Sequence, residues 1–172
     1  MMVMMQQLLL ALSMASGVAA AGEPCANIKF KEDGFSHQIT ADVASMYFQN
    51  GSWNTGWKAT FADGKVDLLF RAGIYSLSRS IVDGGTTVKF LLADGDVVEV
   101  GITGEVTPTY SEGRTLWPLQ MKPDAATLTR LASQTITAVR VAIGGSDQTY
   151  TGLDVDAKKL QRVLRCFASK SG

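Results

Sequence analysis

The residues best suited to acid–base or nucleophilic chemistry gather in one short stretch of the sequence. His37 is the single histidine of the chain, and Asp33 and Ser36 stand within four residues of it. These three residue types can form a hydrolase site, but only in a geometry that a sequence does not reveal. The sequence also lacks the Gly-x-Ser-x-Gly turn of many serine hydrolases. We therefore expect no catalytic residue and interpret residues 33–37 as a polar turn before a strand, with a hydrolase of unrecognised site as an alternative.

Two pairs of acidic residues have a spacing that could serve carboxylate chemistry or bind a metal. Asp94 and Asp96 flank a glycine, and Asp154 closely precedes Asp156. Both pairs have plain structural explanations, in a hairpin turn and at the start of a helix. Neither is accompanied by the other ligands of a calcium loop. No glycine-rich loop with a lysine indicates a nucleotide site. The sequence thus predicts no metal and no cofactor.

Aromatic residues crowd into the segment 47–57, where Tyr47, Trp53 and Trp57 form a candidate binding surface. Trp and Tyr are over-represented where proteins contact their partners. If these side chains are exposed, the segment could bind a glycan, another small ligand or a protein. The competing interpretation is that Trp57 and Phe48 belong to the core and that only Trp53 stands at the edge of a loop.

The N-terminal segment has the layout of a cleavable export signal. An apolar run over residues 8–18 is followed by small residues, and Ala21 offers a cleavage position. The run is shorter than the roughly 20 residues that cross a bilayer. We therefore expect residues 1–21 to be removed and residues 22–172 to form a single exported domain, periplasmic or extracellular, without an integral membrane segment.

The two cysteines, Cys25 and Cys166, stand near opposite ends of that exported part. In an oxidising compartment an even pair of cysteines predicts a disulfide. Two thiols without a neighbouring histidine are a poor metal site. The predicted bridge would tie a C-terminal helix to a short first strand predicted at residues 28–31.

Alternating apolar residues predict two hairpins. In the first, a two-residue loop at Asp63-Gly64 places Phe61 opposite Val66, so that both apolar sets share one face. In the second, residues 88–102 alternate on both sides of a three-residue loop that ends at Gly95 in a left-handed conformation.

The C-terminal segment has the spacing of an amphipathic helix. We predict Asp156 as its N-cap, with Val155 packed on Leu160. Its apolar face has the members Leu160, Val163, Leu164 and Phe167. A shorter helix is predicted to begin at Pro123-Asp124 and to turn Leu128 toward the core.

Two segments are less well defined by their patterns. Residues 39–48 fit either a strand or a short helix, and residues 108–118, with a proline at each end, predict an irregular crossing. Together these elements predict an α+β fold. It consists mainly of an antiparallel, hairpin-rich β-sheet, with a short helix and a C-terminal amphipathic helix packed on it.

The charge balance bears on the kind of partner. Sixteen basic and sixteen acidic residues cancel, whereas nucleic-acid-binding proteins carry a basic face. We therefore expect no nucleic acid as a partner. The preferred hypothesis is a non-enzymatic exported domain that binds another exported or envelope protein, as an inhibitor, an immunity protein or an assembly accessory. A small-ligand or glycan-binding module that uses residues 47–57 is the first alternative.

Overall fold

The computed structural model describes residues 23–51, 53–74 and 78–171. These residues form one ten-stranded sheet, in which every strand pair is antiparallel, and two helices. The strands are β1 (Lys31–Glu32), β2 (Ile39–Asn50), β3 (Trp53–Ala62), β4 (Lys65–Ile74), β5 (Thr87–Leu92), β6 (Val97–Gly101), β7 (Thr109–Ser111), β8 (Arg114–Met121), β9 (Ile136–Ile143) and β10 (Ser146–Gly152). The helices are α1 (Ala125–Ser133) and α2 (Asp154–Lys170). The predicted α+β class is confirmed.

The sheet bends until strands near its two ends meet. Its order is β6-β5-β9-β10-β2-β3-β4-β8-β7, and β1 pairs with β2 beside this path. Just beyond β6, Ile102 forms a bridge with Met121 at the end of β8, and the Thr103 N–H donates to the Gln120 carbonyl at 2.7 Å. The alternating strands therefore turn their apolar residues toward one enclosed side.

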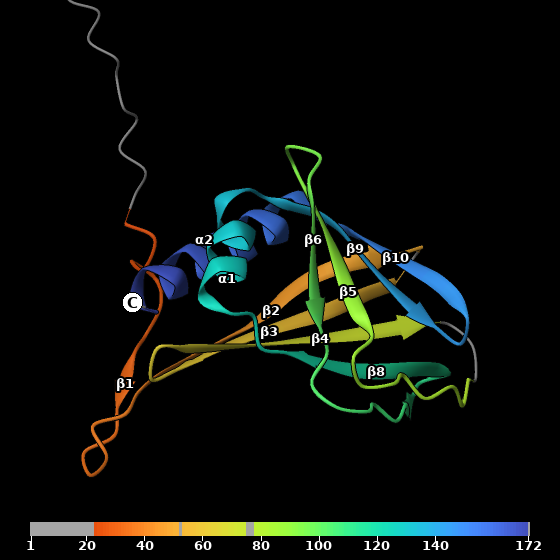
Figure 1. The fold of residues 1–172 in the computed structure, drawn as a ribbon, viewed down its shortest axis with the longest axis horizontal. Helices are drawn as coiled ribbons and strands as arrows, with labels where there is room; N and C mark the ends of the chain where they lie inside the picture. The colour runs from red at the N-terminus through yellow and green to blue at the C-terminus, as the bar shows by residue number, and fades with distance from the viewer. Residues whose placement is uncertain (1–22, 52, 75–77, 172) are drawn as a thin grey trace, which may run out of the picture.

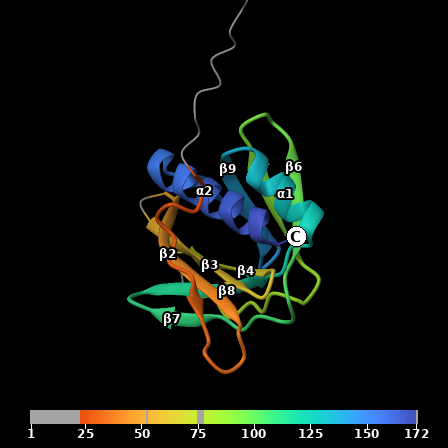
Figure 2. The same ribbon diagram turned by 90° about the vertical axis from the view of Figure 1, so that its left-hand side faces the viewer.

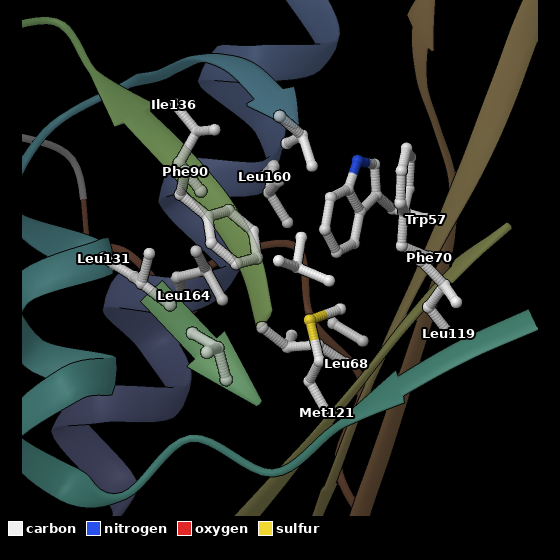
Figure 3. Packing of buried hydrophobic residues seen from close by; sticks show 14 of the residues in the cluster. Trp57, Leu68, Phe70, Phe90, Leu119, Met121, Leu131, Ile136, Leu160 and Leu164 are labelled. Atoms are coloured by element: carbon white, nitrogen blue, oxygen red, sulfur yellow. The ribbon is translucent and has the colours of Figure 1, made fainter. Parts of the chain in front are cut away.

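The helices close this enclosed side (Figures 1 and 2). Helix α2 contacts β2 and β9, and α1 packs against α2. Inside, the Trp57 ring stacks on Phe70 with 4.4 Å between the ring centroids. Figure 3 shows the side chains of Leu160 and Leu164 from α2 meeting those of the strands around Phe90. Strands from distant parts of the sequence thus share one hydrophobic core with both helices.

Both predicted hairpins are confirmed in register. Phe61 pairs with Val66 across the Asp63-Gly64 turn, where both turn residues have positive φ. In the second hairpin Phe90 pairs with Val98, and Gly95 at the turn also has positive φ. Positive φ at both central residues is the geometry of the two-residue turn that matches strand twist.

The irregular crossing predicted for residues 108–118 is wrong. The structure has a hairpin there, β7 and β8, and β8 continues along β4. Pro118 lies opposite Arg71 of β4, beyond the last β7 pair at Leu116. A proline lacks an N–H and is tolerated in a strand on a side without a partner, so this proline does not interrupt β8.

The predicted start of the C-terminal helix is also wrong. Helix α2 begins at Asp154, its N-cap is Leu153, and no side chain caps it. Asp156 lies inside the first turn, where an acid still favours the positive helix end. Val155 is 75% exposed and does not pack as a staple. The predicted apolar face, in contrast, is buried as a whole. At α1, Asp124 is the N-cap, and its carboxylate accepts a hydrogen bond from the Thr127 N–H at 2.7 Å.

Cys25 and Cys166 form a disulfide between the N-terminal segment and α2. The bond joins residues that are 141 positions apart. No helix within the described ranges is long and apolar enough to cross a membrane. The predicted export signal, residues 1–21, lies outside the described residues.

Candidate interaction surface

A short hairpin made by β1 and the start of β2 projects away from the sheet and the helices, as Figures 1 and 2 show in orange. Its turn is organised around Asp33. The Asp33 carboxylate accepts hydrogen bonds from the backbone N–H groups of Phe35 at 3.0 Å and Ser36 at 2.7 Å. It also accepts a hydrogen bond from the Ser36 hydroxyl at 2.9 Å. A carboxylate that satisfies several donors holds a turn in a defined conformation.

These hydrogen bonds fix the charge of Asp33 as well as its position. The backbone N–H of Ser36, the Ser36 hydroxyl and the backbone N–H of Phe35, in that order, hold the pKa of the Asp33 carboxyl below its ordinary value. Donors to a carboxylate favour its ionised form. The hydrogen bonds and the negative charge of Asp33 therefore support each other.

Phe35 stands at the tip of this hairpin and is 100% exposed. Beside the hairpin base lies an open hollow of about 510 Å³, lined by Phe30, His37, Ile39, Asp63 and Lys170 among others. The Lys170 ammonium lies 6.0 Å from the centroid of the Phe30 ring. We name the set Phe30, Phe35, His37, Ile39, Asp63 and Lys170 the tip surface.

The hairpin base is anchored to the rest of the molecule. Phe30 packs edge-on against Phe61, with 5.8 Å between the ring centroids, and against Phe167 of α2 at 6.4 Å. Gln38 donates a hydrogen bond from its side-chain amide to the Asp63 carboxylate at 2.6 Å. The exposed Phe35 is therefore carried on a structured support and not on an isolated loop.

The candidate hydrolase residues lie together in this turn but not as a catalytic triad. His37 Nδ1 lies 3.0 Å from Glu32 Oε1, and the Ser36 hydroxyl is bound by Asp33. A serine nucleophile needs a hydrogen bond to the histidine that takes its proton. Here each of the two side chains is engaged by a different carboxylate, so the arrangement serves the turn.

The pair Asp94 and Asp96 lies in a hairpin turn as expected, whereas Asp154 and Asp156 lie in the first turn of α2 and neither caps it. Arg130 of α1 binds Asp94 at 2.8 Å and also binds Asp96, which ties the β5–β6 turn to the helix. The hydrogen bond from Arg130 lowers the pKa of Asp94. Asp154 pairs with Lys158 at 2.9 Å. Within the described part of the chain no group of three or more His, Cys, Asp or Glu side chains could hold a metal ion.

The aromatic segment does not form one exposed surface. Trp57 is only 2% exposed, because its alternation with Ala59 and Phe61 turns it into the core. Tyr47 is 41% exposed and lies on the opposite face, next to Gly56. The side chain of Trp53 lies outside the described residues. The structure thus removes Trp57 from the candidate binding surface and bears out its alternative assignment to the core.

Phe35 escaped the sequence analysis because a single aromatic residue in a polar turn has no periodic pattern. Its only signal is its position, between glycine and serine and two residues after an aspartate that organises the turn.

Comparison of the chain with protein-family models, with curated proteins and with solved structures finds no match.

Proposed function

We propose that the chain is an exported, non-enzymatic binding domain that recognises another exported or envelope protein through the tip surface. The observation that supports this proposal above all others is the fully exposed Phe35 on a hydrogen-bonded turn. An inhibitor, an immunity protein or an accessory subunit of an envelope assembly would use such a surface.

Phe35 favours binding because its apolar side chain is exposed to water and gains free energy when a partner covers it. Covering a phenylalanine side chain with apolar surface contributes roughly 1.5–3 kcal/mol. The Asp33 hydrogen bonds hold the turn in advance, so less conformational entropy is lost when a partner binds. Aromatic residues that are fixed before binding are typical anchors of protein interfaces.

The shape of the tip surface favours a protein over a small molecule. Small ligands are usually enclosed in concave pockets, whereas Phe35 projects outward and the adjoining hollow is open. Glu32 and Asp33 precede Phe35 in the chain, and Lys170 lines the adjoining hollow. A partner with an apolar cavity and a mixed polar rim would complement this arrangement.

The disulfide supports the exported location within this proposal. Disulfides persist in oxidising compartments such as the periplasm and the extracellular medium. The bond between Cys25 and Cys166 would therefore be stable where the predicted export signal directs the chain.

A pair of matched substitutions tests the proposal. The tagged, oxidised chain is used to capture partners from the envelope fraction of its source, in parallel with Phe35→Ser and Val155→Ser. Val155 is also exposed, at 75%, but it lies on α2. We expect one stoichiometric partner that is captured by the chain and by Val155→Ser, and that is lost with Phe35→Ser. Capture that is equal for all three proteins, or no partner after crosslinking, would contradict the proposal.

A further inference from the structure

Among the residues that the structure describes, a stretch of β2 has no strand neighbour on the side away from β3. On that side β1 pairs only with Ile39 and Thr40, and β10 pairs only with Phe48 and Gln49. Upstream of β1 the chain leaves the sheet, because Phe30 packs against Phe61 and Phe167. Backbone groups along residues 42–47 of β2 therefore border an opening in the sheet edge.

A hollow of about 350 Å³ occupies this opening. We name it the edge hollow; it lies between the N-terminal segment, β2 and one face of α2, and its lining includes Pro24, Ile28, Val43, Lys159, Arg162 and Val163. Its apolar lining includes the aliphatic side chains of Ile28, Val43 and Val163, which we call the floor.

Two cations and one acid accompany the apolar floor. The Lys159 ammonium donates to the Ala44 carbonyl of β2 at 3.4 Å, so it lies close to the open strand. Arg162 makes no hydrogen bond or ion pair within the described ranges, and Glu23 is the only acid of the lining. Positive charge therefore predominates at the edge hollow although the chain as a whole is neutral.

We propose that the edge hollow binds the C-terminal residue of a polypeptide, with an apolar side chain on the floor and the terminal carboxylate at Arg162 and Lys159. The floor and the two cations share a volume of about 350 Å³. A single residue that carries both an apolar side chain and a carboxylate would meet the floor and the two cations together. Among polypeptide residues only an apolar C-terminal residue does so.

The adjacent strand supports a peptide over a free aliphatic acid. Unpaired N–H and C=O groups at a strand edge bind extended peptides by adding a strand. A fatty acid has no main chain to use them. The bulge between Ala44 and Met46 twists this edge, and Lys159 already donates to Ala44. Both features obstruct a long added strand, so the site accepts the short end of a chain.

The disulfide holds one wall of the edge hollow in place. Cys25 belongs to the N-terminal segment that forms this wall, and its partner Cys166 lies on α2, which forms another. The segment also contains its own turn, in which the Ile28 N–H donates to the Cys25 carbonyl at 3.0 Å. A wall fixed before binding favours affinity, and we expect reduction of the disulfide to weaken binding.

The proposal is tested with a fluorescein-labelled peptide of sequence Gly-Ser-Gly-Ser-Leu-Val that has a free C-terminal carboxylate. Fluorescence anisotropy compares it with the same peptide ending in an amide. We expect the carboxylate form to bind the oxidised chain at least about tenfold more tightly. Arg162→Glu should weaken binding of the carboxylate form by at least about tenfold. Lys158→Glu makes the same charge change on the same helix outside the edge hollow and should alter it by less than about twofold.

Several outcomes would contradict the proposal that the edge hollow binds a C-terminal residue. They are equal binding of acid and amide, equal losses in Arg162→Glu and Lys158→Glu, or no binding below about 1 mM. Displacement of the peptide by octanoate at a concentration near the peptide Kd would assign the site to free aliphatic acids instead. The inference goes beyond the proposed function, because the edge hollow shares no lining residue with the hollow of the tip surface. Phe35→Ser should leave peptide binding unchanged, so that failure of one proposal is distinguishable from failure of the other.

Discussion

At the scale of single residues, the turn at Asp33 predicts a specific dependence on pH. The hydrogen bonds from Ser36 and Phe35 hold the pKa of this carboxyl below its ordinary value, which is about 3.9. A carboxyl whose folded pKa is lowered contributes stability that is present above its unfolded pKa and is lost as the pH falls through the folded one. The turn should therefore persist at pH 4 and loosen only below that.

Nuclear magnetic resonance can follow this transition directly. The amide signals of Phe35 and Ser36, which donate to the carboxylate, should move with a single midpoint below about 3.9. In Asp33→Asn the same two signals should show no such titration. A midpoint at or above the ordinary value would mean that the carboxylate does not organise the turn.

Single residues also show how far the sequence could predict a site. Trp57 shares alternation with Ala59 and Phe61, and this periodicity predicts its burial more reliably than its residue type predicts a binding role. The significance of Phe35 depends on what surrounds it in space. Its full exposure follows from a turn that projects the side chain away from every neighbouring element, and no local pattern contains that information.

At the scale of elements, helix α2 should contribute strongly to stability. Leu164 is fully buried and contacts the core between the strands (Figure 3). Removing a buried leucine leaves a cavity, and Leu164→Ala should cost roughly 2–5 kcal/mol in the free energy of unfolding. Chemical denaturation followed by circular dichroism measures this difference.

Val155 of the same helix provides the matched control. It is 75% exposed, and substitutions at exposed positions usually change stability by less than about 0.5 kcal/mol. Val155→Ala should therefore unfold like the unsubstituted chain. A free energy of unfolding of Leu164→Ala that equals that of Val155→Ala would mean that α2 is not docked on the sheet.

Local patterns predicted those elements whose determinants are local. The turn residues Asp63-Gly64 and Gly95 fix both hairpin registers, because backbone geometry at a tight turn admits few residue types. Pro118 is compatible with β8 only because of the side on which β4 pairs, and the local sequence does not contain that information. The sequence did not predict that α2 starts at Asp154, because no side chain caps this helix and the usual N-cap signal is missing there.

At the scale of the whole molecule, the sheet order is set by contacts between distant segments. Strand β5 pairs with β9, and β10 pairs with β2, although long segments of sequence separate the partners. Such pairings depend on the complete set of apolar faces and not on any one turn. The edge hollow arises at this scale, where the N-terminal segment, β2 and α2 meet. The sequence could therefore predict the fold class and the disulfide but not the open stretch of β2.

The disulfide is the strongest constraint at this scale, and its removal gives the largest predicted effect. It closes a loop between cysteines that are 141 residues apart. Such a loop lowers the entropy of the unfolded chain and raises the free energy of unfolding by roughly 5 kcal/mol. We expect the guanidinium midpoint of unfolding to fall by about 1 M or more in a reductant such as TCEP. Cys25→Ala/Cys166→Ala serves as the control, because the reductant should leave its midpoint unchanged. Two alkylatable thiols in the native exported protein, or a midpoint that TCEP does not move, would contradict the predicted bond. A large shift would show that the bond links α2 and the N-terminal segment under native conditions, as the edge hollow requires.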